Sequence, residues 1–265
     1  MNIFAVGDLH LSFDVRVRKP MDVFGPEWAN HADRLKENWE RAVGPEDLVL
    51  IPGDISWGLK PDEAEADLKW IEALPGRKIL TKGNHDLWWM TAGKLNGRFR
   101  DMFFLQNTSV LVRPDGSLTP GREGQQKANA YPAPEERLED CWFICGTRGW
   151  TCPGSDGFEA HDEKIYRREV MRLRFSLEDA RVRGAAPGRI IAMLHYPPTN
   201  EKLQRSDFTD LLREYEAGLC VYGHLHGKEN FRRGMQGHFN DVDYRLVSLD
   251  SLACEPALLC TVGEE

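Results

Sequence analysis

Residues 80–89 read LTKGNHDLWW, in which Gly83, Asn84, His85 and Asp86 separate a short apolar run from a Leu-Trp-Trp cluster. An amide, an imidazole and a carboxylate stand side by side here, and burying such groups without partners costs about 1–3 kcal/mol each. An ordinary turn is one explanation, because Gly-Asn is common turn chemistry. A functional site is the other, and the polar residues elsewhere in the chain decide between the two.

Similar polar residues follow other apolar runs that we predict to be strands. Together with the stretch quoted above, five predicted strands end at such residues. In chain order these are Asp8 and His10, then Asp54, then Asn84, then His195, and finally His224 and His226. In open α/β sheets ligands gather outside the carboxyl ends of the strands, so these ends can form one site. Residues two apart in extended chain point the same way, so each histidine-containing pair can face that site. Core packing explains any one of these histidines better. With His85 included, however, five of the chain's eight histidines lie at strand ends, which favours a shared site.

The residue types at these strand ends indicate a metal centre. Carboxylate, imidazole and amide ligands without thiolate suit manganese, iron or zinc better than a sulfur-rich structural zinc site. Seven candidate ligands exceed the needs of one tetrahedral ion and match two ions bridged by a carboxylate. Two divalent ions bring four positive charges, of which Asp8 and Asp54 cancel only two. The site is therefore expected to attract a phosphate ester.

The rest of the chain predicts alternating strands and amphipathic helices. Helices are predicted from Trp28 to Ala42, from Pro61 to Ile71 and over residues 162–183. Residues 114–136 have no periodicity and many turn formers, which predicts a long loop or flap. Strands are predicted at residues 2–6, 48–52, 78–81, 109–113, 142–146, 190–194, 219–222, 245–249 and 257–262.

Length and composition favour one compact domain over residues 1–265. Hydrophobic residues make up 41% of the chain and charged residues 29%, as in globular proteins. The net charge of −8 argues against broad binding to nucleic acid or to anionic membranes. We therefore expect no membrane partner, and the net charge disfavours a nucleic-acid partner without excluding one.

The compartment is predicted from the N-terminus and the cysteines. The sequence MNIFAVGDLH has no basic segment, and its apolar stretch is too short for a signal peptide. No segment approaches the roughly 20 apolar residues of a membrane span. The six cysteines form no CxxC pair, and four of them lie in apolar runs. We predict reduced core cysteines and a cytoplasmic protein.

Taken together, DLH, GD, GNHD, a lone histidine after a strand, and GHLH resemble the motifs of the calcineurin-like metallophosphoesterases. The motifs occur in the order of that family and span residues 8–226. The resemblance implies a four-layer αββα sandwich of two mixed sheets. It also implies a centre of two divalent or trivalent metal ions at one edge of the paired sheets.

The resemblance assigns a role to each motif residue. His85 would protonate the departing alkoxide after water activated at the two ions attacks phosphorus, and Asp86 would orient the His85 imidazole. Asp54 would bridge the two ions. The ligands of the first ion would be Asp8, His10, Asp54 and His226, and those of the second would be Asp54, Asn84, His195 and His224.

Departures from relatives bear on the substrate. Phosphoprotein phosphatases of this superfamily have an arginine shortly after GD and a glutamate after GNH, whereas this chain reads GDISWG and GNHD. A phosphodiesterase-like or general phosphoesterase acting on a small phosphate ester or nucleotide is therefore favoured. Alternatives are a phosphoprotein phosphatase or nuclease of the same superfamily, a non-catalytic metal-dependent scaffold, and a dinuclear amidohydrolase.

Several residues beside the motifs are candidates for substrate contacts. Arg148, in GTRGW directly after a strand, can bind a substrate phosphate or form a structural ion pair. Tyr196, next to His195, is a weaker candidate of the same kind. Trp57, Trp88 and Trp89 lie beside ligand loops and can stack on a nucleobase, although core packing explains them better.

Overall fold

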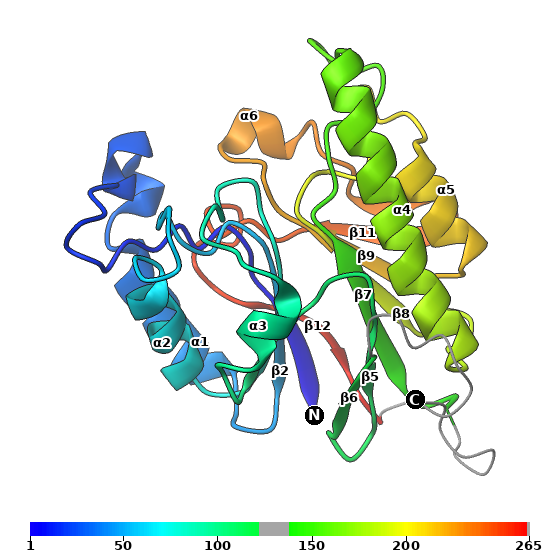
Figure 1. Ribbon diagram of the computed structural model, residues 1–265, viewed down its shortest axis with the longest axis horizontal. Coiled ribbons are helices and arrows are strands. Elements are labelled where there is room, and N and C mark those ends of the chain that lie inside the picture. The colour runs from blue at the N-terminus through cyan, green and yellow to red at the C-terminus, as the bar shows by residue number, and fades with distance from the viewer. Residues whose placement is uncertain (122–137, 264–265) are drawn as a thin grey trace.

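The computed structural model describes residues 1–121 and 138–263, and its strands form two mixed sheets packed face to face (Figure 1). The first sheet has the order β12 (Ala257–Thr261), β1 (Asn2–Ala5), β2 (Leu48–Pro52), β3 (Arg77–Thr81) and β4 (Met102–Phe104). The second has the order β10 (Gly237–Phe239), β11 (Val242–Leu246), β9 (Leu219–Tyr222), β8 (Ile190–Leu194), β7 (Trp142–Thr147), β5 (Val110–Val112) and β6 (Leu118–Pro120).

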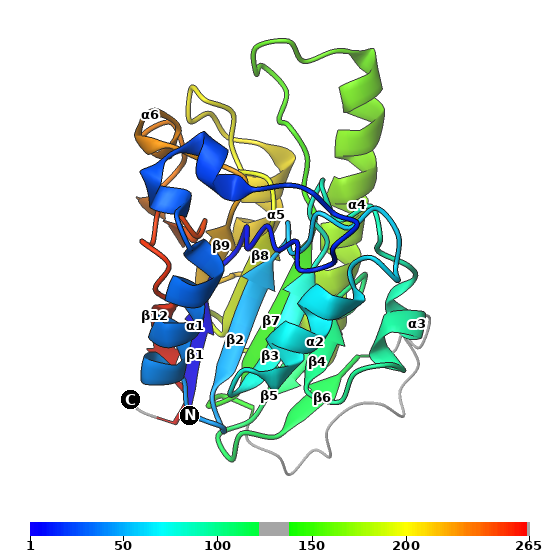
Figure 2. The same ribbon diagram turned by 90° about the vertical axis from the view of Figure 1, so that its left-hand side faces the viewer.

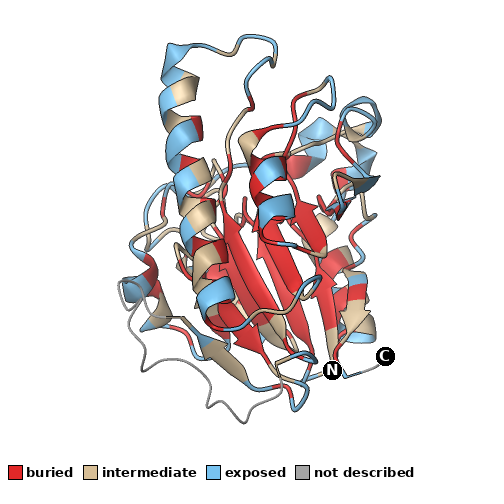
Figure 3. Ribbon diagram, turned by 90° about the vertical axis from the view of Figure 1, so that its right-hand side faces the viewer, coloured by how far each residue is buried: buried red, intermediate tan, exposed pale blue. Residues whose placement is uncertain are grey.

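Helices cover the outer face of each sheet. Figure 2 shows α1 (His31–Ala42) and α2 (Glu65–Ala73) over the first sheet, with α3 (Ala92–Asn96) at its β4 edge. Figure 3 shows α4 (Ala160–Val182) and α5 (Asp207–Glu214) over the second sheet, with their buried sides turned toward the strands. Two short 3₁₀ turns, Met21–Phe24 and Pro26–Trp28, precede α1, and α6 (Lys228–Phe231) follows β9. The predicted αββα sandwich is confirmed.

The strands are apolar on both faces because each sheet lies between two apolar layers. Ile3 and Ala5 of β1 belong to the core between the sheets, whereas Phe4 packs in the core under α1 and α2. In β2, Leu50 belongs to the core between the sheets, and Ile51 belongs to the core under α1 and α2. Residues alternate between the faces of a strand, so a strand buried on both sides reads as a continuous apolar run.

The parallel strands bring their carboxyl ends to one edge of the sandwich. Strands β1, β2, β3 and β4 run parallel to one another, and so do β7, β8, β9 and β11. The loops that follow these strands meet at the top of the molecule in Figure 1. This geometry places the polar motifs of both sheets at a common edge.

Differences from the predicted elements lie mainly at the sheet edges and at short helices. The strand predicted at 245–249 is β11, which begins and ends three residues earlier, at Val242–Leu246. Strands β4, β6 and β10 and helices α3, α5 and α6 were not predicted. The loop predicted at 114–136 falls largely on residues 122–136, which lie outside those described, and Leu118–Pro120 within it form β6.

The cysteines and helices bear on two further predictions. Within the described residues no disulfide is present, and five of the six cysteines are buried, as predicted for core residues. None of the helices in the described parts of the chain is long and apolar enough to span a bilayer.

Candidate metal centre

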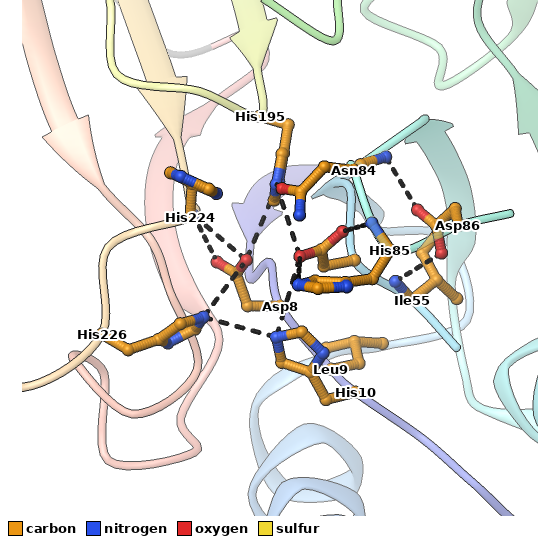
Figure 4. Close-up of polar contacts among 12 residues, drawn as sticks. Asp8, Leu9, His10, Ile55, Asn84, His85, Asp86, His195, His224 and His226 are labelled. Carbon is orange, nitrogen blue, oxygen red and sulfur yellow. Dashed lines mark hydrogen bonds and ion pairs between the residues drawn. The ribbon is translucent and has the colours of Figure 1, made fainter. Parts of the chain in front are cut away.

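The loops at the common edge are held together by backbone hydrogen bonds between neighbouring strand ends. The N–H of Asp8 donates to the Gly53 carbonyl at 3.0 Å, and the N–H of His10 donates to the Asp54 carbonyl at 3.0 Å. In the second sheet the N–H of Gly223 donates to the His195 carbonyl at 3.1 Å. These bonds set the polar side chains of five loops around one point (Figure 4).

Four of these motif residues have a left-handed backbone conformation. The φ angles are 57° at Asp8, 47° at His10, 50° at Asp54 and 71° at His224. Such conformations cost about 1–3 kcal/mol each and cluster at functional sites. They also correct the sequence argument, because Asp8 and His10 face the same point through a tight turn and not through extended chain.

Glycines allow two carboxylates to enter this centre. A Cβ at Gly223 would collide with Oδ2 of Asp8, and a Cβ at Gly83 would collide with Oδ1 of Asp54. The glycines of the GHLH and GNHD motifs therefore provide the space that the carboxylates of Asp8 and Asp54 occupy.

Asp8, His10 and His226 form one group that can hold a metal ion. One ligand atom from each lies within 4.8 Å of the others. The Nε2 atoms of His10 and His226 are 3.3 Å apart. The backbone N–H of His224, in the loop after β9, donates to both carboxylate oxygens of Asp8 at 3.0 Å. Two imidazole nitrogens that face each other at this distance fit ligation of one cation.

Asp54, His195 and His224 form a second group with the same spacing, within 4.8 Å. His195 Nδ1 lies 3.1 Å from the Pro52 carbonyl oxygen, so Nδ1–H donates to it and the Nε2 lone pair faces the centre. That lone pair is 2.7 Å from Oδ1 of Asn84. A shared cation satisfies both acceptors, so Asn84 fits as a further ligand of this group.

Asp54 lies between the two groups. Its Oδ2 is 3.8 Å from Nε2 of His10 and 3.4 Å from Nε2 of His195. Its Oδ1 accepts the backbone N–H of His85 at 2.8 Å. One carboxylate oxygen thus faces both groups, as a bridging ligand requires.

Burial sets the protonation of these groups. It raises the pKa of Asp8 to about 8 and also raises that of Asp54. It lowers the pKa of His195 to about 3 and that of His10 and His224 well below the usual value, so these rings are neutral and their lone pairs are available. Apart from His226, the imidazoles beside these carboxylates are neutral, so two buried carboxylates have little positive counter-charge. Two metal ions would supply it, so the residues present fit a dinuclear centre.

His226 departs from the other histidines because a second acidic residue holds it. Burial lowers its pKa, but hydrogen bonding to Asp250 and the charge of Asp8 outweigh burial and raise it. Oδ1 of Asp250 lies 3.0 Å from Nδ1 of His226, and Oδ2 accepts the N–H of Gly227 at 3.0 Å. Asp250 is not among the residues predicted from the sequence. Its signal is an acidic residue just after the strand-like run RLVSL, the same pattern that marks Asp8 and Asp54.

His85 lies at the rim of the centre and belongs to neither metal group. Its side chain is 44% exposed, and its Nε2 is 4.0 Å from Oδ2 of Asp54. Its ring packs against Trp57 with centroids 4.4 Å apart. An imidazole next to the ligands but open to solvent can transfer a proton to a bound molecule.

Asp86 has a different role from the predicted one. Its buried carboxylate accepts the backbone N–H groups of Gly83 at 2.8 Å, Ile55 at 2.9 Å and Ser56 at 3.2 Å, and the Trp88 indole N–H at 3.0 Å. Within the described residues it has no contact with the His85 imidazole, because the chain reverses between the two residues and their side chains point apart (Figure 4). Through these hydrogen bonds, Asp86 connects the loop after β2 to the loop after β3.

Two cavities meet at His224. One, of about 400 Å³, has an apolar wall of Met21, Phe24, Trp28 and Trp57 and is also lined by His10, Asp54, His85 and His226. The other, of about 250 Å³, is lined on the far side of His224 by residues that include Tyr196, Asn200, Asn230 and Arg233. The centre is thus open on two sides, one apolar and one polar.

The remaining predicted contact residues divide between these cavities and the core. Tyr196 is buried beside the centre, with its ring 4.1 Å from that of His224. Trp57 lines the apolar cavity, whereas Trp88 is a buried core residue. Arg148 lines neither cavity, because its Nη2 points to Glu169 at 3.5 Å and its guanidinium stacks on Trp150. Arg148 and Trp89 line a third cavity instead.

Comparison with known proteins finds a match to the family model described as calcineurin-like phosphoesterase over residues 1–228. Curated relatives include the Gene 66 proteins of Mycobacterium phage D29, 41% identical over 85 residues, and of Mycobacterium phage L5, 37% identical over 87 residues. Each match covers 32% of this chain and 40% of the relative, so the chain spans about two fifths of the length of these relatives.

Two solved structures align with most of the chain at 15% sequence identity. One is the protein of unknown function AQ665 from Aquifex aeolicus, with a TM-score of 0.48 and coverage of 97% of this chain and 95% of the other. The second is the phosphopantetheinyl hydrolase PptH from Mycobacterium tuberculosis, with a TM-score of 0.49 and coverage of 93% and 88%.

Proposed function

The chain belongs to the calcineurin-like phosphoesterase family, and from this membership we propose that it hydrolyses phosphate esters at a centre of two metal ions. One observation supports the proposal above all others. Two groups of metal-competent side chains lie side by side, and a single oxygen of Asp54 faces both. Paired sites bridged by a carboxylate are typical of enzymes that displace groups at phosphorus.

We assign the ligands according to the two groups, with Asp54 shared. Oxygen and nitrogen ligands without thiolate favour manganese, iron or zinc. When bound, the ions would supply Lewis acidity toward the phosphoryl oxygens and lower the pKa of water. The first set is Asp8, His10, Asp54 and His226, and the second is Asp54, Asn84, His195 and His224.

The protein's own contribution to the chemistry lies in His85. Its imidazole stands at the wall of the apolar cavity, where an ester's leaving group would lie. The backbone N–H of His85 donates to Asp54, which holds this part of the loop beside the ligands, and the ring packs against Trp57. We propose that Nε2–H of His85 protonates the departing alkoxide.

The two cavities support a diester substrate over a monoester. A phosphodiester has two ester groups, and the metal centre opens into one cavity on each side of His224. The apolar wall with Trp57 suits a ring or another apolar group, and the Tyr196 side suits a polar group. A phosphomonoesterase needs only one of these cavities.

We further propose a small-molecule substrate and a cytoplasmic location. Cavities of about 250 and 400 Å³ suit a small molecule or nucleotide. The net charge of −8 disfavours a nucleic-acid substrate. Buried cysteines without disulfides among the described residues suit a reducing compartment.

The proposal is tested by metal-dependent turnover. Purified protein is stripped of metal, loaded with manganese, iron or zinc, and assayed on matched panels of phosphodiesters and phosphomonoesters with the same leaving groups. We expect turnover only in loaded samples, and diesters to be hydrolysed at least as well as monoesters. Full activity in a sample shown by elemental analysis to lack metal would refute metal dependence. A preference for phosphoserine peptides over every diester would refute the substrate class.

The bridging role of Asp54 has a separate measurement. Asp54→Ala should reduce metal content below two ions per chain and abolish turnover together, because both groups lose a ligand. Asp33→Ala is the matched control, since Asp33 is an exposed carboxylate on α1 with no ligand role. An Asp54→Ala protein that still contains two ions per chain would show that the bridging assignment is incorrect.

A further inference from the structure

The third cavity lies beside the metal centre and is strongly basic. It has a volume of about 340 Å³ and is bordered by the loops after β3 and β4, the end of β7 and the side of α4 that bears Arg168, Glu169 and Arg172. Four cationic side chains line it, from Lys82, Arg148, Arg168 and Arg172, and one acidic side chain, from Glu169. Four positive charges and one negative charge leave an excess of three positive charges, in a chain whose net charge is −8.

The single carboxylate in this cavity does not neutralise the cations. Glu169 is buried, and its Oε1 lies 2.9 Å from Nη1 of Arg172 and 3.5 Å from both Arg148 and Arg168. Its Oε2 accepts the hydroxyl of Thr147 at 2.7 Å. Three guanidinium groups share one carboxylate, so Glu169 positions the arginines and leaves their charge uncompensated.

One donor in the cavity has no partner among the described residues. Lys82 is half-buried, lines the cavity and makes no hydrogen bond or ion pair with any residue that the structure describes. Half-buried donors are normally paired, and an unpaired one costs about 1–3 kcal/mol. A bound anion would give the Lys82 ammonium a partner.

We propose that this cavity is a second binding site, distinct from the metal centre, for a multiply charged phosphate anion. Lys82, Arg148 and Arg168 contact the anion, and Glu169 holds the arginines in place. Arginine forks and a lysine ammonium suit phosphate oxygens, and an excess of three charges favours a phosphate over a singly charged carboxylate. The ligand is either free phosphate or a second phosphate group of the substrate.

The same loops connect the two sites. The carbonyl of Arg148 accepts the N–H of His195 at 2.9 Å, and Lys82 precedes the ligand Asn84 by two residues. The anion site is therefore close to the centre but uses none of its side chains. The proposal goes beyond the proposed function. Only the substrate's second phosphate, as one of the two ligand sources, rests on that function, and phosphate binding itself is measured without turnover.

Binding of inorganic phosphate to the metal-loaded full-length protein tests the proposal directly. We expect calorimetric titration to show a binding site that Lys82→Met weakens by about tenfold or more, as loss of one charge-assisted hydrogen bond predicts. Lys164→Met is the matched control, because Lys164 is an exposed lysine on α4 outside the cavity, and it should leave the titration unchanged. Arg168→Met, at a side chain that is 52% exposed, should weaken the same site without disturbing the fold.

Titrations of wild type, Lys82→Met and Arg168→Met that coincide would overturn the proposal. That result would leave the hydrolytic function intact, because phosphate binding is measured without turnover. A further comparison separates the two sources of the anion. If the site holds a substrate's second phosphate, Lys82→Met raises KM for a diester that also has a phosphomonoester group and not for the same diester without it. If free phosphate is the ligand, Lys82→Met leaves both KM values unchanged and still weakens phosphate binding.

Discussion

His85 differs from every metal-competent residue around it because its side chain is 44% exposed. If it transfers a proton to the leaving group, His85→Ala should keep both metal ions and slow turnover by roughly a hundredfold to ten-thousandfold. An alkyl alkoxide needs protonation far more than a nitrophenolate does. The loss should therefore be large on an alkyl ester and smaller on a nitrophenyl ester.

Metal content and the two substrates together distinguish the possible roles of His85. Equal losses on both esters, with metal retained, would mean that His85 stabilises the phosphoryl group or binds substrate. Loss of metal would make His85 a ligand. Undiminished activity would reduce the GNHD motif to a turn that delivers Asn84.

Gly223 shows how a residue without a side chain shapes the centre. A Cβ at this position would occupy the place of the Asp8 carboxylate, so Gly223→Ala must displace either Asp8 or the loop that bears His224. We expect this variant to bind metal more weakly, as measured by titration with manganese. Gly93→Ala is the control, because a Cβ there meets no atom within 4 Å. Equal metal affinity in both variants would show that the loop has room to move.

At the scale of elements, α5 depends on its N-terminal cap. The hydroxyl of Ser206 accepts the N–H groups of Phe208 at 3.1 Å and Thr209 at 3.2 Å, and the Thr209 hydroxyl accepts the N–H of Ser206 at 2.9 Å. Ser206→Ala should lower the free energy of unfolding by about 0.5–2 kcal/mol. Denaturant unfolding measures this loss, and Ser206→Thr should recover most of it. Equal stability of all three proteins would contradict the capping role.

Most of the strands that could be predicted are those whose residues face two apolar layers. β2 and β8 are buried along their whole length and read as LVLIP and IIAML, which no surface element would tolerate. Short strands at or near sheet edges lack this signal. β6 and β10 have three residues each and are partly exposed. Hydrogen bonds to neighbouring strands make them strands, and their sequences have no strand pattern. β11 was predicted three residues too late because Val247 and Leu249 continue its apolar pattern beyond the strand.

At the scale of the whole molecule, the convergence of the motif side chains was predictable and their surroundings were not. Asp8, Asp54 and His195 follow strands, so their convergence follows from the shared edge of parallel strands. The apolar wall comes from Met21 to Trp28, a segment with no motif whose position depends on tertiary packing. The prediction that Asp86 orients the His85 imidazole was wrong, because the side chains of residues adjacent in sequence can point apart in a tight turn.

The metal ions should also contribute to the stability of the whole molecule. Asp8 and Asp54 are buried with their pKa values raised, which means that the folded state without cations holds their charge at a disadvantage. A ligand at about one hundred times its dissociation constant stabilises the folded state by about 2.7 kcal/mol. Two such ions correspond to a Tm difference of roughly 10–20 °C for a chain of this size.

Thermal unfolding of chelated and metal-loaded protein tests this coupling. We expect Tm to fall on chelation and to return when metal is added back, with a dependence on free metal concentration. In Asp54→Ala the same treatment should shift Tm much less, because both groups of ligands are incomplete. Surface binding of metal would stabilise both proteins alike, so the difference between them isolates the centre. If the wild-type Tm is the same with and without metal, although elemental analysis shows that the ions have been removed, the buried carboxylates are compensated by protonation and the ions play no part in holding the two sheets together.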